Sequence, residues 1–281
     1  MAKELGQIHN VNETATVTLA DQGSAIRRID LPGLLSEELQ RMVRAGNYFK
    51  LCGIDISITP DVTGPADGAS VSGYFRYYSP TQGRCAAFRH AFKSAADLME
   101  SQGIPMRQNK LYDFRPSLTN SSTLQNVMKN QATLDGTTGL ALEDSGSIGA
   151  NIFEVYNKSI QPTALNTPVN QLFDEGFDTI IAAGAAKTDF VLNEAAIYDG
   201  NDDLADLTFS QIPFQIAFAP GARTLSFQFR PDPALYIAVM TGQLELCIED
   251  VDLDGAATSV QVSCDLMVSG WKSIMGNPKN R

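Results

Sequence analysis

In the stretch Val260-Gln261-Val262-Ser263-Cys264-Asp265-Leu266-Met267-Val268, every second side chain is apolar. This period of two is typical of a β-strand with one buried and one solvated face. Four earlier stretches alternate in the same way, at 212–218, 225–229, 235–239 and 244–248. Pro-Gly, Asp-Gly and Pro-Asp-Pro turns separate these stretches. Regular short strands of this kind predict a sandwich or barrel rather than strands that alternate with helices.

The first half of the chain combines further strands with the few helices that the sequence predicts. Alternation indicates strands over 14–19, 54–58 and 71–78. The clearest helix is predicted over 84–102, where apolar side chains recur at helical spacing after a capping threonine or serine. Two shorter helices are expected. They cover 36–45, starting at a serine cap, and 169–175.

The composition limits the classes of protein that fit. Of 281 residues, 43% are apolar, which is enough for a sizeable core, and only 19% are charged, below the roughly 25% of ordinary globular domains. We expect no secretory signal, because the first residues lack an apolar stretch. No apolar run approaches the ~20 residues of a membrane span. A net charge of −11 argues against extended, sequence-specific contact with nucleic acid.

The charge is distributed unevenly along the chain. Residues 1–130 carry 14 basic and 12 acidic side chains, whereas residues 131–281 carry 7 basic and 20 acidic ones. Two segments with such different electrostatics are expected to face different surroundings. We therefore predict two β-rich domains, 1–145 with the helix at about 84–102, and 146–281.

The four cysteines, Cys52, Cys85, Cys247 and Cys264, lack the paired spacings of zinc ribbons and thioredoxin-like motifs. Without an export signal, we expect buried thiols rather than disulfides. The motifs of the common hydrolases, dinucleotide-binding enzymes, P-loop proteins and zinc proteases are also absent. We therefore expect no enzyme, no catalytic residues and no cofactor.

Only two histidines, His9 and His90, are available as imidazole bases, and both are interpreted as surface or packed side chains. A pair of carboxylates is the remaining catalytic alternative, because the two acids of a polysaccharide hydrolase need only be neighbours in space. The aromatic stretch 74–78 suggests either a stacking platform for RNA or a core strand with tyrosines at a protein contact. The lack of surrounding basic residues favours the core strand.

One local pattern resembles a metal-binding loop. Asp250, Asp252 and Asp254, followed by Gly255, match the opening of an EF-hand calcium loop, in which oxygen ligands occupy alternate positions. The position of the closing glutamate holds Gln261, and strands rather than helices flank the loop. Two interpretations follow, a calcium site or an acidic β-turn, and the turn is the simpler one.

The segment Ser72-Gly73-Tyr74-Phe75-Arg76-Tyr77-Tyr78-Ser79-Pro80-Thr81-Gln82-Gly83-Arg84 runs from an aromatic strand into the amphipathic helix. Taken with two strand-rich halves, it resembles the double jelly-roll major capsid proteins of icosahedral, membrane-containing bacteriophages, the finnlakevirus type in particular. The resemblance implies two jelly-roll domains side by side, 1–145 and 146–281, with few short helices. It also implies trimers that form pseudo-hexameric blocks of a shell.

The expected function is therefore that of a major capsid subunit, located in the virion and assembled in the host cytoplasm. The resemblance implies contacts with neighbouring capsomers, with minor capsid or vertex proteins and with an internal membrane. The low charge of the chain suits large subunit interfaces, whose centres are depleted in charged side chains. The alternatives are a β-sandwich adhesin or spike module that binds a host surface and, less favoured, a polysaccharide hydrolase.

Overall fold

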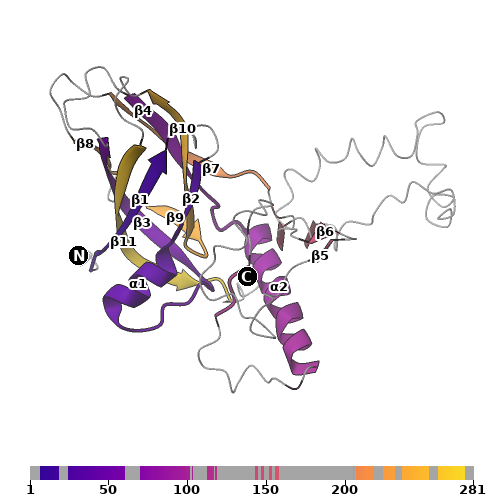
Figure 1. The fold of residues 1–281 in the computed structure, drawn as a ribbon. Helices are drawn as coiled ribbons and strands as arrows, with labels where there is room; N and C mark the ends of the chain where they lie inside the picture. Colours follow the sequence, from indigo (N-terminus) through magenta and orange to yellow (C-terminus); the bar gives the residue numbers. More distant parts are fainter. Residues whose placement is uncertain are drawn as a thin grey trace, which may run out of the picture.

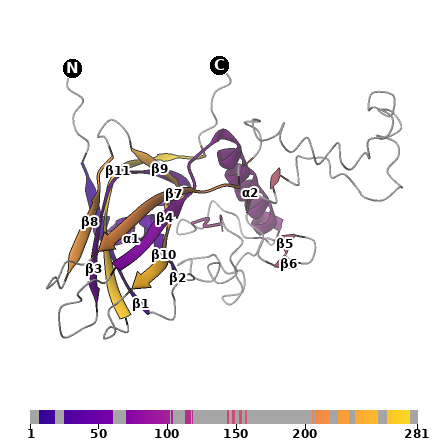
Figure 2. The ribbon, with the colours of Figure 1, turned by 90° about the horizontal axis from the view of Figure 1, so that it is seen from above.

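The structure is a computed structural model, and it describes residues 7–18, 25–60, 70–101, 103, 113–116, 118, 143–144, 147–148, 152–153, 156–157, 205, 207–217, 224–231, 236–252 and 259–275. These residues form mainly β-strands, so the predicted fold class is confirmed at that level. Two antiparallel sheets pack face to face, and one long helix stands beside them (Figures 1 and 2).

Each sheet contains strands from both ends of the chain. Sheet A contains, in spatial order, β1 (His9–Thr18), β11 (Ser259–Ser273), β3 (Asn47–Pro60) and β8 (Leu225–Phe229), and β9 (Ile237–Met240) also pairs with β3. Sheet B contains β2 (Ala25–Asp30), β10 (Gln243–Asp252), β4 (Ser70–Tyr77) and β7 (Ser210–Ala217). The short strands β5 (Glu143–Asp144) and β6 (Ser147–Ile148) pair only with each other.

The chain passes from one sheet to the other at almost every connection between these strands. The strands β1, β3, β8 and β11 lie in sheet A, and β2, β4, β7 and β10 lie in sheet B. The strands β8 and β9 pair with successive parts of β3, so they act as one interrupted edge strand. Pro231 lies in the interruption, where a residue without an N–H group costs no ladder hydrogen bond.

The core lies between the sheets and follows the alternation of the sequence. In β11, the apolar side chains Val260, Val262, Cys264, Leu266 and Val268 are all buried. They pack in one cluster with the inward side chains of the neighbouring strands. The period-two signal therefore located the strands of both halves, and it did so because one face of each strand is buried.

The strand β2 is the one element of the sandwich that the sequence did not predict. Its sequence, Ala-Ile-Arg-Arg-Ile-Asp, does not alternate cleanly, and two arginines occupy its centre. It is short and lies at the edge of sheet B, where only one side pairs with another strand. Position in the sheet, rather than local pattern, makes this segment a strand.

The helix expected over 36–45 is placed differently in the structure. Helix α1 covers Leu31–Leu39 and ends at Gln40, which adopts a left-handed conformation. Ser36 lies inside this helix, where its hydroxyl donates to the Pro32 carbonyl oxygen at 2.6 Å and accepts from the Val43 amide at 2.8 Å. The prediction was wrong because a proline at the start of a helix fixes the first turn earlier than the serine signal.

The long helix is confirmed. Helix α2 covers Gln82–Ser101, and the Thr81 hydroxyl accepts from the Arg84 amide at 3.3 Å, as expected of a cap. Gly103 follows with a positive φ of 76°, and its amide donates to the Glu100 carbonyl oxygen. The helix predicted over 169–175 lies outside the described residues. No helix in the described ranges is long and apolar enough to cross a membrane.

The division into domains 1–145 and 146–281 does not fit the described strands. Strand β10, from the second segment, lies between β2 and β4 of the first, and β11 lies between β1 and β3. The described strands of both segments therefore belong to one sandwich. The alternation in a sequence locates strands but does not state which strands pair.

Candidate functional site

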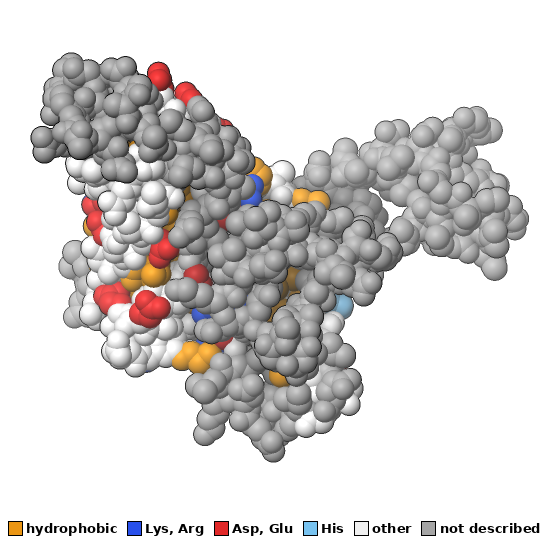
Figure 3. Space-filling view, viewed as in Figure 1, with side chains coloured by type: hydrophobic (Ala, Val, Ile, Leu, Met, Phe, Trp, Pro, Cys, Tyr) orange, Lys and Arg blue, Asp and Glu red, His pale blue; other side chains and the backbone are white. Residues whose placement is uncertain are grey.

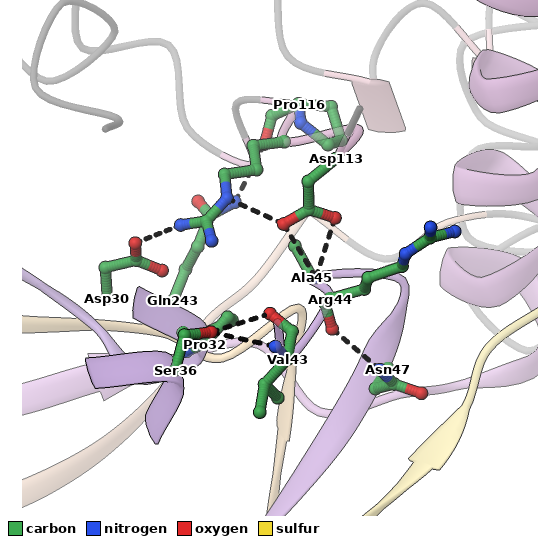
Figure 4. Close-up of polar contacts among 11 residues, drawn as sticks. Asp30, Pro32, Ser36, Val43, Arg44, Ala45, Asn47, Asp113, Pro116 and Gln243 are labelled. Carbon is green, nitrogen blue, oxygen red and sulfur yellow. Dashed lines mark hydrogen bonds and ion pairs between the residues drawn. The ribbon is translucent and has the colours of Figure 1, made fainter. Parts of the chain in front are cut away.

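The most elaborate polar structure in the described residues lies where the chain after α2 meets one end of the sandwich (Figure 4). It joins side chains and backbone groups from distant parts of the sequence. We call this group the Arg115 cluster, and its members are Asp30, Ala45, Asp113, Arg115, Pro116 and Gln243. It connects segment 113–116 to the end of β2, the start of β3 and the start of β10.

Arg115 is the centre of this cluster. Its Nε atom donates to Asp113 Oδ2 at 2.8 Å, and its Nη1 atom donates to Asp30 Oδ2. Only 3% of the Arg115 side chain and 4% of the Asp113 side chain are exposed. A buried guanidinium between two carboxylates is stable only because each charge has its partner, so removal of one member leaves an uncompensated charge.

The other contacts tie this ion-pair network to the backbone. The Ala45 amide donates to both carboxylate oxygens of Asp113, at 3.0 and 3.2 Å. The Gln243 side chain donates to the Pro116 carbonyl oxygen at 2.8 Å. Burial raises the pKa of the Asp113 carboxyl, while Arg115 and the Ala45 amide oppose this effect. All of these contacts connect segment 113–116 to the sandwich. The role of the site is therefore to hold this segment in position.

A tight turn holds the same corner of the sandwich. Thr241 and Gly242 join β9 to β10, and both have positive φ values, of 53° and 69°. The Leu31 amide, at the start of α1, donates to the Gly242 carbonyl oxygen at 3.1 Å. A Cβ atom on Gly242 would lie 2.4 Å from Pro32 Cδ and 2.9 Å from the Phe49 ring. The position requires glycine for its conformation and for the close approach of α1.

Helix α2 has an apolar core of its own, separate from that between the sheets. Buried side chains from the helix, from the strand ends and from the described segments between β4 and β7 form this second core. They are Ala87, Phe88, Leu118, Ile152, Phe153, Ala205, Met240 and Ile274. The second core packs the helix against the end of the sandwich (Figure 2).

Arg84 joins the second core to the sandwich. It is 2% exposed, and its guanidinium donates to the Ser79 carbonyl oxygen and hydroxyl and to the Thr208 carbonyl oxygen. The same guanidinium lies over the Tyr78 ring, 5.5 Å from the ring centre, and near the Phe153 ring. Residues 78 and 208 flank the long segment between β4 and β7. Because Arg84 contacts both residues, it links the two ends of that segment.

The outer face of sheet B is buried along part of β10. Gln243, Glu245 and Cys247 point away from the sheet-to-sheet core, yet each is less than 6% exposed. Glu245 pairs with Arg76 of β4, and the Arg76 guanidinium lies 5.3 Å from the centre of the Phe209 ring. A strand covered on both faces shows that the sandwich is packed against further chain on this side.

The residues of the predicted calcium site are only partly visible. Asp250 and Asp252 lie in β10 and pair across the sheet with β4, whereas Asp254 lies outside the described residues. Within the described ranges, no group of three or more histidine, cysteine or acidic side chains is arranged to hold a metal. The calcium site therefore stays a prediction from the sequence.

The remaining candidate residues have structural surroundings. The His9 ring lies 5.8 Å from Trp271, and the His90 ring lies 5.9 Å from Tyr156. The four cysteines are free thiols; Cys247 and Cys264 are buried, whereas Cys52 and Cys85 are half-buried, so the expected burial holds for two of the four. Burial raises the pKa of Cys264 to about 12, which keeps it protonated and unreactive. None of these groups forms a nucleophile–base pair in the described contacts.

Sequence reasoning missed the Arg115 cluster. Its members come from four places in the chain, and Asp30 and Arg115 are separated by 85 positions. One local signal was present: Asp-Phe-Arg-Pro at 113–116 places opposite charges two residues apart in an otherwise polar region. No family model matches the chain, and comparison with curated proteins and with solved structures also gives no match.

Proposed function

We propose that this protein is a virion structural protein, the major capsid subunit of an icosahedral shell that assembles in the host cytoplasm. The observation that carries the proposal is the strand order, β1-β11-β3-β8 in one sheet and β2-β10-β4-β7 in the other. With β8 and β9 counted as one interrupted strand, this order is the one expected of a jelly roll, an architecture that viral capsid proteins and lectins use.

The arrangement of the first and last strands supports the same function. Strand β1 pairs with β11 over ten positions, and β2 pairs with β10 over six. The first and last strands of the sandwich are therefore tied into the sheets, and helix α2 stands to one side of it (Figure 1). A rigid body with one elaborated side suits a subunit that must present defined surfaces to several neighbours.

The double jelly roll and the pseudo-hexameric trimer remain part of the proposal, but the second jelly roll is now assigned to other residues than 146–281. Because the described sandwich uses both ends of the chain, a second jelly roll would have to come from the residues between β4 and β7. Most of these residues lie outside the described ranges. The partners proposed are further copies of the chain, minor capsid or vertex proteins and an internal membrane.

Native mass spectrometry of the purified full-length chain tests this proposal. We expect oligomers that grow into large assemblies as the protein concentration rises. A trimer as the smallest stable unit would support two jelly rolls in each copy, whereas pentamers and hexamers would support one. A protein that stays monomeric at every concentration and salt condition would overturn the capsid assignment.

The adhesin or spike alternative is favoured by one observation. Phe209 and Tyr236 are 39% and 43% exposed, and both lie in connections next to strand ends, where ligand-binding aromatics are common. A glycan array probed with the isolated protein separates the two functions. Saturable binding that is lost in Tyr236→Ala, together with a monomeric native mass, would favour the adhesin.

A further inference from the structure

The long segment between β4 and β7 leaves the sandwich and returns to it at one point. Strands β4 and β7 pair in continuous register, and the last pair joins Tyr77 to Ser210. Because register partners in an antiparallel pair lie about 5 Å apart, the segment starts and ends side by side. We call residues 78–209 the insertion. It takes the place of a hairpin loop, where a long insertion costs little because loop-closure entropy grows slowly with length.

The core between the sheets is complete without the insertion. Its buried cluster extends from Val11 to Val268 in sequence, and every described member lies outside residues 78–209. The half-buried side chains that pack against this cluster also lie outside the insertion. Acidic side chains are spread over the described surface of the sandwich (Figure 3). A unit with a core of its own and charge on its surface is able to stay folded by itself.

The second core, in contrast, is supplied mainly by the insertion. Six of its eight buried side chains lie within residues 78–209. The sandwich contributes only Met240 and Ile274, together with the half-buried Tyr48. The two cores share no described residue. Two cores that meet over so few apolar side chains are expected to unfold in separate steps.

The contact between the insertion and the sandwich is largely polar. The Arg115 cluster contributes ion pairs and hydrogen bonds, and the Met240 amide donates to the Tyr78 carbonyl oxygen at 2.8 Å. When this contact opens, Arg115 and Asp113 return to water together, so neither charge is left buried without its partner. Solvent therefore replaces the polar contacts, and the apolar side chains of Met240 and Ile274 supply the burial that keeps the insertion closed.

We propose that the described part of the insertion, α2 with the side chains packed on it, opens as a unit while the sandwich stays folded. The hinge lies next to Tyr77 and Ser210, where the two chain segments leave the sandwich side by side. Arg84 lies beyond the hinge and contacts Ser79 and Thr208, so it keeps the two segments together when the unit moves. This device is a property of the fold, so it goes beyond the proposed function and does not depend on it.

The dependence between the two units runs in one direction. The second core needs Met240 and Ile274, which the folded sandwich holds in place. The core between the sheets needs no described residue of the insertion. Opening of the insertion therefore leaves the sandwich core intact, whereas unfolding of the sandwich removes the support of α2.

Urea denaturation of the full-length chain, followed by two signals, tests this order of opening. The single tryptophan, Trp271, lies in β11, so its fluorescence reports the state of the sandwich. Among the described helices, α2 has 20 residues and α1 has 9, so the helical circular dichroism signal reports mainly α2. We expect the helical signal to be lost at a lower urea concentration than the fluorescence signal, because the insertion opens first.

Two fully buried phenylalanines provide matched variants. The Phe153 ring lies in the second core, 5.2 Å from the Tyr78 ring, and the Phe75 ring lies in the sandwich core, 5.8 Å from the Phe214 ring. Phe153→Ala is expected to lower the urea midpoint of the helical signal by about 1–3 M and to leave the fluorescence midpoint unchanged. Phe75→Ala is expected to lower the fluorescence midpoint by a similar amount, and the helical midpoint is expected never to exceed it.

Phe153→Leu is the milder variant that replaces Phe153→Ala if the latter does not fold, and it is expected to move the helical midpoint alone by a smaller amount. If both midpoints move together in the Phe153 variants, the chain is one cooperative unit and the proposal is wrong. It is also wrong if Phe75→Ala unfolds the sandwich while the helical signal persists to higher urea. Either result leaves the capsid assignment untouched, because native mass spectrometry tests that assignment separately.

Discussion

The outer faces of the two sheets differ although both belong to one sandwich. On sheet A, the outward side chains of β1 are short and polar, and Asn12, Thr14 and Thr16 are exposed. On sheet B, the outward side chains Gln243 and Glu245 are buried and hydrogen-bonded or ion-paired. The comparison teaches that the outer face of β1 in sheet A is open to solvent, whereas the outer face of β10 in sheet B is covered over residues 243–247.

The difference also predicts where substitutions destabilise the protein. An outward residue on sheet A loses little when it is changed, because solvent replaces its contacts. An outward residue on sheet B leaves a buried partner without its hydrogen bond or its counter-charge. The first three of the following changes are each compared with a matched residue in more open surroundings.

The largest effect is expected for Arg115→Met. This change leaves Asp30 and Asp113 without their shared cation, and we expect the free energy of unfolding to fall by about 3–5 kcal/mol. Arg230→Met is the control on sheet A. Arg230 pairs with Asp55 but its side chain is 41% exposed, so a loss of at most about 1 kcal/mol is expected. Urea denaturation measures both, and equal losses would contradict the comparison.

Gly242→Ala is expected to cost about 2–4 kcal/mol. The added methyl group would meet Pro32 and Phe49 at a position with positive φ. Gly103 also has a positive φ, of 76°, but nothing lies within 4 Å of an added Cβ atom there. Gly103→Ala should therefore cost only about 1 kcal/mol. Thermal unfolding of the two variants separates the conformational cost from the cost of close packing.

A smaller effect is expected for Gln243→Ala, at about 1–3 kcal/mol, because the buried Pro116 carbonyl oxygen loses its donor. Gln261→Ala changes the same residue type on the exposed outer face of sheet A, and a change within about 0.5 kcal/mol is expected. Limited proteolysis adds a second measurement. Gln243→Ala should expose the segment around Pro116 to cleavage, and an unchanged digestion pattern would show that this contact does not fasten it.

The smallest effect is kinetic and leaves the fold intact. Cys52 is half-buried and Cys247 is buried, and burial raises the pKa of both thiols. We expect iodoacetamide at mildly alkaline pH to modify Cys52 before Cys247. Cys264, with a pKa of about 12, is expected to react only after unfolding. Mass spectrometry of peptides sampled over time gives the order, and prior modification of Cys264 would contradict the assigned core.

Local patterns predicted most strands and the long helix, and they failed where tertiary contacts decide the outcome. The alternation at 260–268 located β11 because one face of that strand is buried. The same alternation could not show that β11 pairs with β1 and β3 from the other end of the chain. Asp30 and Arg115 gave no joint signal, because a buried ion pair between distant segments has no sequence period.

Cryo-electron microscopy of the assembled full-length protein tests the central claim most directly. The account predicts closed particles whose subunits each contain a sandwich with β10 between β2 and β4 and with β11 between β1 and β3. It also predicts that the segment between β4 and β7 is mounted on the side of sheet B. Monomers without shells, or subunits in which residues 1–145 and 146–281 form separate sandwiches, would contradict it.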